Sequence, residues 1–98
     1  EVNPEFPGGD DALMSYLKKN IVYPKTAIDA GIQGTVMVQF VVERDGSITN
    51  VDIYRGKGQI LNVEAIRVVK SMPKWNPGQQ RGKNVRVIFI IPIDFQLQ

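Results

Sequence analysis

The segment from Lys83 to Leu97 constrains the fold of this chain most, because it alternates like a β-strand over an unusual length. Typical strands have about 5–6 residues, whereas here apolar side chains recur at every second position for most of the segment. One face is apolar and carries Val85, Val87, Phe89, Ile91, Ile93, Phe95 and Leu97. The opposite face carries the polar residues Asn84, Arg86, Asp94 and Gln96. The sequence therefore predicts one long strand over residues 83–97.

A proline inside this strand indicates where the strand lies in its sheet. Pro92 has no N–H group and cannot donate to a β-ladder, so it predicts a position at a sheet edge. A long edge strand promotes aggregation unless another segment covers it or a partner uses it. The productive use is β-augmentation, in which a partner's extended segment is added as a further strand. The segment therefore indicates a protein-binding module.

The composition of the chain excludes several other classes of function. With 98 residues, of which 43% are hydrophobic and 22% charged, the chain is expected to form one globular domain. It contains no cysteine and no histidine, which excludes disulfides, thiolate chemistry and imidazole catalysis. No apolar run approaches the roughly 20 residues of a membrane span, and no signal peptide is evident. We expect a mature fragment whose membrane anchor lies upstream.

Enzymatic activity, a metal site and a bound cofactor are not expected. Asp10 and Asp11 are paired carboxylates, but their place at a predicted helix N-terminus explains them through the helix dipole. Gly8-Gly9 lacks the Gly-Lys-Ser/Thr sequence of a phosphate-binding loop. General acid–base catalysis would lack most of the side chains that it normally uses. A binding function is the better prediction.

Basic residues are concentrated near the final strand, although the net charge of the chain is only +2. The charged residues between Glu64 and Asp94 are all basic, and they are Arg67, Lys70, Lys74, Arg81, Lys83 and Arg86. Two interpretations are open: an ordinary solvated surface, or a basic rim that steers acidic partners toward the edge strand. Nucleic-acid binding has less support, because only Trp75 interleaves with these charges. We therefore expect no nucleic-acid partner.

Turn and capping residues divide the chain into an irregular lead-in over residues 1–9 and one domain over residues 10–98. Asp10 and Asn62 are expected to be the N-caps of two helices, over 10–20 and 62–72. The predicted apolar stripe of the first helix is Leu13, Met14 and Leu17, and that of the second helix is Ala65, Ile66, Val69 and Met72. The remaining elements are a short helical segment over 26–30, a strand from residue 34 and a strand over 48–53.

The connections between the strands predict the topology of the sheet. Asp45-Gly46 predicts a hairpin between the first two strands, and the phase of the second strand predicts a β-bulge near Thr49 or Asn50. The second and third strands are joined by a helix, which favours a parallel relation through a right-handed crossover. The spatial order 2-1-3 satisfies both connections. The expected fold class is α+β, with helices packed on one face of a three-stranded antiparallel/mixed sheet.

Several of these features occur together in the order of one known family. Tyr23-Pro24, Ala27 and Gly31 come first, followed by Gly34-x-Val36-x-Val38-x-Phe40, Asp45-Gly46, Val51, Ile53, Trp75, Pro77-Gly78 and Phe95. Over residues 21–97 this pattern resembles the C-terminal domain of TonB-type energy transducers. The lead-in Phe6-Pro7-Gly8-Gly9 is similar to the version in Bacteroidetes-type bacteria.

The resemblance implies a function, a location and a binding site. Members of this family are anchored in the inner membrane, cross the periplasm and grip outer-membrane receptors that import siderophores or other scarce nutrients. A proton-driven motor complex in the inner membrane supplies the energy through the N-terminal part of the protein. A short receptor segment, the TonB box, is added as a strand beside the last strand. The implied partner-binding residues are Tyr23, Pro24, Asn84, Val85, Arg86, Val87, Ile88, Phe89, Ile90 and Ile91.

Other interpretations are open at this point. TonB-like domains also occur attached to membrane-embedded sensor peptidases, where the domain would receive a signal; the upstream sequence would distinguish the two hosts. Tyr23-Pro24 is alternatively a turn that packs on the sheet, and packing is the favoured interpretation of Trp75. The second sheet face is partly apolar, which indicates self-association as a homodimer, and its residues are Met37, Val41, Ile88 and Ile90.

Overall fold

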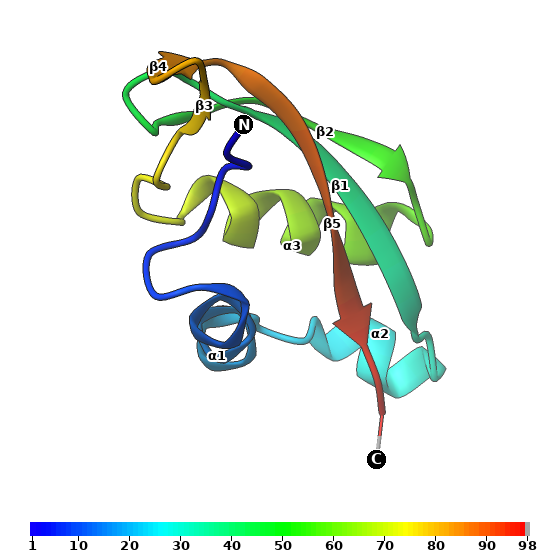
Figure 1. Ribbon diagram of the computed structural model, residues 1–98. Coiled ribbons are helices and arrows are strands. Elements are labelled where there is room, and N and C mark those ends of the chain that lie inside the picture. The colour runs from blue at the N-terminus through cyan, green and yellow to red at the C-terminus, as the bar shows by residue number, and fades with distance from the viewer. Residues whose placement is uncertain (98) are drawn as a thin grey trace.

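The computed structural model describes residues 1–97, which form three helices, a three-stranded sheet and a small hairpin (Figure 1). The helices are α1 (Asp10–Asn20), α2 (Lys25–Ala30) and α3 (Gln59–Lys70). The sheet contains β1 (Gly34–Val42), β2 (Ile48–Arg55) and β5 (Val87–Phe95), and the hairpin contains β3 (Gly78–Gln80) and β4 (Lys83–Val85). Of the helices within residues 1–97, none is both long and apolar enough to cross a membrane.

The central strand of the sheet is β1, which pairs antiparallel with β2 on one side and with β5 on the other. β2 and β5 therefore run parallel to each other without being neighbours, as the helical connection between them predicts. The helices lie on one side of this sheet, with α3 beneath the strands (Figure 1). The α+β class and the strand order 2-1-3 are confirmed.

The pairing of β1 with β2 is irregular, whereas its pairing with β5 is continuous. Between the pairs Gln39–Asp52 and Val41–Thr49, β2 has one more residue than β1, and Asn50 there has a positive φ of 51°. The predicted bulge near Thr49 or Asn50 is confirmed. A second irregularity occurs nearer the start of β1 and was not expected.

The prediction of one strand over residues 83–97 is wrong, because the segment forms two strands with different partners. β4 pairs with β3, whereas β5 pairs with β1. Arg86 lies at the break, where its guanidinium contacts the Glu43 carboxylate, with an Nε–Oε1 distance of 3.0 Å. The β3–β4 turn contains Arg81 and Gly82, both with positive φ. The alternation of apolar and polar residues continues through the break, because Val85 and Val87, on either side of Arg86, keep the period of two.

The first helix differs from the sequence-based expectation at its start and on its surface. Gly9, rather than Asp10, is the N-cap of α1, and Asp10 is the first helical residue. Leu13 and Leu17 are buried, but Met14 is 55% exposed, so its assignment to the apolar stripe is wrong. Leu13 and Leu17 are four residues apart and define the buried line of the helix, and Met14 lies beside this line.

The third helix begins three residues earlier than expected. Its N-cap is Gly58, and Asn62 lies inside the helix, where its side-chain oxygen accepts a hydrogen bond from the Lys57 backbone N–H at 2.9 Å. Asn62 therefore satisfies a backbone donor just before the helix without being its cap. Ile66, expected to point inward, is only half-buried. The residues of α3 that are buried are Leu61, Glu64, Ala65, Val68 and Val69.

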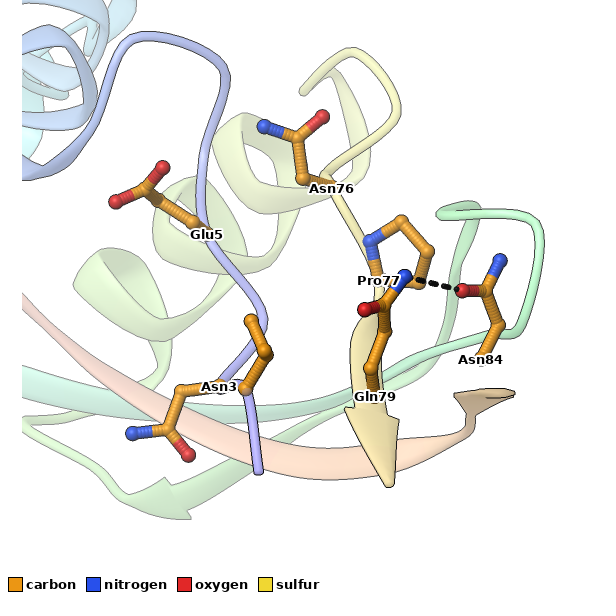
Figure 2. Close-up of a pocket in the computed structure, with 7 residues that line it drawn as sticks. Asn3, Glu5, Asn76, Pro77, Gln79 and Asn84 are labelled. Carbon is orange, nitrogen blue, oxygen red and sulfur yellow. Dashed lines mark hydrogen bonds between the residues drawn. The ribbon is translucent and has the colours of Figure 1, made fainter. Parts of the chain in front are cut away.

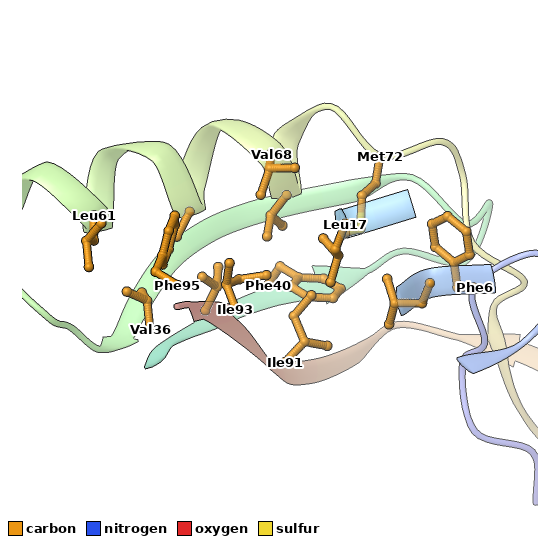
Figure 3. Packing of buried hydrophobic residues seen from close by; sticks show 14 of the residues in the cluster. Phe6, Leu17, Val36, Phe40, Leu61, Val68, Met72, Ile91, Ile93 and Phe95 are labelled. Carbon is orange, nitrogen blue, oxygen red and sulfur yellow. The ribbon is translucent and has the colours of Figure 1, made fainter. Parts of the chain in front are cut away.

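The core lies between the sheet and the helices, and both contribute fully buried side chains (Figure 3). The largest of these are Phe40, Phe95, Leu61, Ile93, Val36, Val38, Val42, Val68 and Val69. The strand residues in this set follow the period of two that the sequence shows in β1 and β5. The inward faces of both strands are therefore as predicted.

An aromatic cluster closes one end of the core. Trp75 is 3% exposed, and its ring centroid lies 5.8 Å from that of Phe6, 5.3 Å from that of Phe40 and 5.4 Å from that of Phe89. Phe6 belongs to the lead-in, which also forms antiparallel bridges to the segment 76–79. Trp75 therefore packs in the core, and the lead-in contributes to the same core.

Candidate protein-binding site

The outer edge of β5 has no strand partner in the described part of the chain, because β5 is the last strand of the order β2-β1-β5. Its register with β1 is continuous from the pair Gly34–Phe95 to the pair Val42–Val87. A paired edge strand of nine residues thus presents one row of backbone groups to a partner. This geometry is suited to strand addition.

The orientation of Pro92 defines which groups face outward. Pro92 pairs with Met37 in the unbroken ladder, and a proline within a paired strand places its nitrogen on the unpaired side. Along a strand, alternate residues direct their N–H and C=O groups to the same edge. Ile88, Ile90 and Asp94 therefore direct their N–H groups outward. The outward row therefore has N–H donors at residues 88 and 90 and lacks a donor at residue 92.

The structure divides the expected binding residues of the last segment into two groups, with Arg86 at the break between them. Val87 to Ile91 belong to β5 and lie along its unpaired edge. Asn84 and Val85 belong to β4, where they pair with Gln79 and Gly78 of β3. The side-chain amide of Asn84 also donates to the Arg44 backbone oxygen at 3.1 Å. The candidate edge therefore begins at Val87, one residue after the break.

Tyr23 and Pro24 lie near the other end of β5. The Tyr23 ring is edge-on to Phe95, with centroids 5.5 Å apart, and its hydroxyl donates to the Ile32 backbone oxygen. Pro24 is the N-cap of α2. At about 3.3 Å per residue, Phe95 is roughly 26 Å from Val87 along the strand. The structure therefore separates Tyr23-Pro24 from the residues around Val87, and Tyr23 has a packing role.

An ion pair between the buried carboxylate of Glu64 and the exposed Arg67 holds the chain just before Tyr23. Glu64 is 8% exposed, and its carboxylate accepts hydrogen bonds from Arg67 Nε and Nη2 at 2.7 Å each and from the Val22 backbone N–H at 2.7 Å. Arg67 also donates to the Asn20 backbone oxygen at 2.8 Å. Burial raises the pKa of the Glu64 carboxyl, but the hydrogen bonds from Arg67 and Val22 outweigh burial and lower it overall. The ionised pair thus connects α3 to the segment that follows α1.

We expect Glu64→Gln to reduce stability at pH 7 by about 1–2 kcal/mol, because the hydrogen bonds to a charged acceptor weaken. The pKa of Glu64 is lower in the folded chain than its ordinary value of 4.5. Its contribution is therefore present above about pH 4.5 and is lost as the pH falls through the lower, folded value. Urea unfolding at pH 7 and pH 3 measures both effects. The loss of unfolding free energy in Glu64→Gln should be smaller at pH 3 than at pH 7. An equal loss at both pH values would contradict the stabilising role of the ionised Glu64 carboxylate. Glu5→Gln, at an exposed position, is the control.

The expected basic rim is partly neutralised by one acid on the same helix as its partner and by two acids from distant parts of the chain. Arg67 pairs with Glu64, Lys74 with Asp45 at 3.5 Å, and Arg86 with Glu43. Hydrogen bonds from Ser47, with help from Lys74, hold the pKa of Asp45 at about 2, so this acid is ionised at neutral pH. Half of the six cations are therefore paired, which weakens the steering interpretation.

Two hollows flank the edge region. One has a volume of about 480 Å³ and lies between the lead-in and the β3–β4 hairpin (Figure 2). Its lining includes Asn84, whose side-chain oxygen accepts a hydrogen bond from Gln79 at 3.1 Å. The other has a volume of about 490 Å³ and lies between α1 and the last part of β5. The sequence did not point to the second hollow, because Met14, which lines it, was assigned to the core.

Clusters of acidic side chains that could hold a metal ion are not found among residues 1–97. The architecture is thus an α+β domain with an unpaired edge strand, and edges of this kind are where strand-adding protein-binding modules receive extended segments.

Comparison with known proteins gives the family. The family model described as the Gram-negative bacterial TonB protein C-terminal matches residues 19–97. The chain belongs to this family. Protein TonB of Helicobacter pylori is 32% identical over 77 residues, which cover 78% of this chain and 26% of that protein, in each of two strains. The chain thus spans about a quarter of the length of these curated relatives.

Solved structures agree with this assignment. Two solution structures of the Helicobacter pylori TonB C-terminal domain superpose with TM-scores of 0.69 and 0.66, at 30% and 29% identity. Each match covers 87% of this chain, and the matches cover 77% and 89% of the respective chains. The TonB family transduces energy and is not an enzyme family. The resemblance inferred from the sequence is confirmed, and the Bacteroidetes lineage stays a prediction.

Proposed function

We propose that this chain is the periplasmic, receptor-binding domain of an inner-membrane-anchored energy transducer. It grips outer-membrane TonB-dependent receptors and delivers to them energy that a proton-driven motor complex supplies through the rest of the protein. The observation that carries the proposal is the unpaired edge of β5 in a domain of the TonB C-terminal family. The curated relatives are named protein TonB, which supports a transducer rather than a sensor peptidase as the host protein.

The proposed binding mode is addition of the receptor's TonB box as a strand along β5. The outward N–H and C=O groups of Ile88 and Ile90 supply the ladder. Asn84, Val85 and Arg86 flank the start of this edge, and Tyr23 and Pro24 flank its other end. In this arrangement the mechanical load between transducer and receptor is shared among the hydrogen bonds of the ladder. Each of these bonds contributes only about 0.5–1.5 kcal/mol net.

Titration with a receptor-derived TonB-box peptide tests this mode of binding. The amide chemical shifts of Val87 to Ile91 are expected to move most, because their backbone groups acquire a neighbouring strand. The shifts of α3, which lies beneath the sheet (Figure 1), are expected to move little. Changes confined to the helices would contradict strand addition along β5.

We also propose that the isolated domain self-associates as a homodimer through the same edge or the adjoining open face. Ile88 is 66% exposed and Tyr54 is 57% exposed, and both belong to strands of the sheet. Exposed apolar surface of this kind marks interaction sites. Sedimentation at rising concentration is expected to show dimers in the high micromolar range, and Ile88→Lys is expected to suppress them. A strict monomer over that range would contradict the proposal.

A further inference from the structure

We propose that the groove between α1 and β5 holds one large apolar side chain of the added receptor strand and thereby determines which receptors bind. This inference rests on the strand addition proposed above and deepens it. The groove is lined on one side by Met14, Ser15, Leu17 and Lys18 of α1. It is completed by Ile21 and Tyr23, and by Pro92, Asp94 and Gln96 at the end of the last strand.

The groove is continuous with the edge to which the strand would be added. An added strand lies about 4.7–4.9 Å from its neighbour, and its side chains point alternately to the two faces of the sheet. Opposite the last part of β5, the side chains that point toward the helices enter the space beside α1. Leu17, Ile21 and Tyr23 give this space an apolar lining, and its volume of about 490 Å³ is within the usual range for ligand sites.

The backbone ladder weakens at the level where the groove opens. Pro92 has no N–H group to donate to an added strand, so main-chain recognition is interrupted there. Pro92 also lines the groove, together with Asp94. Side-chain contacts are therefore available at the position where main-chain bonds are missing. Main-chain bonds accept almost any sequence, whereas a shaped groove discriminates between side chains.

The exposure and position of Met14 support the same conclusion. Met14 is 55% exposed on the rim, and methionine adapts to apolar side chains of different shape. Met14, Ser15, Leu17 and Lys18 precede residues 19–97, which the family model matches. Part of the groove is thus supplied by residues of α1 that precede the segment matched by the family model.

A double-mutant cycle between protein and peptide tests the inference. A receptor-derived TonB-box peptide is compared with variants in which each large apolar residue in turn is replaced by serine. Ser15→Trp fills the groove from an exposed helix position, and Lys19→Trp places the same side chain on α1 outside the groove. We expect Ser15→Trp to weaken binding of the parent peptide by about 10–100-fold, with Lys19→Trp close to the parent protein.

One serine variant of the peptide should already bind about 10–100-fold more weakly and should be almost insensitive to Ser15→Trp, because the two changes remove the same contact. Equal weakening of all peptides by Ser15→Trp, or no weakening, would overturn the inference. Ile90→Pro separates the two proposals in this assay. If Ile90→Pro abolishes binding of all peptides and Ser15→Trp has no effect, strand addition holds and the groove proposal fails. Unchanged binding by Ile90→Pro counts against strand addition itself.

Discussion

Ile90→Pro is expected to weaken binding of a receptor-derived TonB-box peptide by about a hundred-fold or more while the domain stays folded. The substitution removes an outward N–H group and leaves the opposing carbonyl of the added strand unpaired, which costs about 1–3 kcal/mol beyond the lost bond. The proline ring also projects toward the added strand. A factor of a hundred corresponds to about 2.8 kcal/mol. Isothermal titration calorimetry measures the affinity, and a thermal melt measures the fold.

Two matched variants separate the backbone effect from the side-chain effect. Ile90→Ala removes the same side chain but keeps the N–H group, so it should bind within a few-fold of the parent domain. Phe89→Pro removes an N–H group that points toward β1 and part of the aromatic cluster, so it should lose the fold instead. A folded Ile90→Pro domain with unchanged affinity would exclude this edge as the receptor site.

The edge position of the last strand could be predicted from the sequence, but its internal break could not. Pro92 indicates the edge position, because the absence of an N–H donor is a property of this one residue and is visible in the sequence. The change of partner at Arg86 depends on a second hairpin, β3–β4, and on the ion pair with Glu43, 43 residues away. Alternation reports only which face a side chain occupies, so it continues unchanged through such a break.

The candidate site was predictable only in part for a similar reason. The ladder residues Ile88 and Ile90 follow from alternation and Pro92. The groove depends on α1, whose short apolar pattern is compatible with more than one orientation of the helix. The pattern places Met14 in one apolar stripe with Leu13 and Leu17, because Leu17 is four residues from Leu13 and three from Met14, and only the burial of Leu13 and the exposure of Met14 in the folded domain define the orientation. Likewise, a run of basic residues gives no indication that distant acids, such as Asp45, will pair with them.

At Gly46, glycine is needed both for the local turn and for a contact with a residue that is distant in the sequence. Asp45-Gly46 was correctly interpreted as a hairpin turn, and Gly46 has a φ of 87°. The structure adds that the Trp75 backbone N–H donates to the Gly46 oxygen at 2.8 Å. A Cβ atom on Gly46 would lie 2.0 Å from the Trp75 backbone oxygen. Glycine is therefore required both by the turn and by this close approach.

We expect Gly46→Ala to destabilise the domain by more than about 3 kcal/mol. The left-handed backbone alone costs an alanine about 1–2 kcal/mol, and the added Cβ atom must also displace a backbone oxygen next to the buried Trp75. Gly82→Ala is the matched control, because Gly82 has a φ of 76° but open space around the added atom. For a domain of this size, 1 kcal/mol shifts the melting temperature by roughly 4–8 °C.

The two glycine variants should thus differ sharply in a thermal melt. Gly82→Ala should melt about 5–15 °C below the parent domain, and Gly46→Ala more than about 15 °C below it. The chain contains one tryptophan, so its fluorescence reports directly on the aromatic cluster. At a temperature where Gly82→Ala is folded, a red-shifted emission in Gly46→Ala would show that Trp75 has lost its packing against Phe6. If both variants melt within a few degrees of each other, the contact between Gly46 and Trp75 is not a determinant of the fold, and the turn conformation alone explains the glycine.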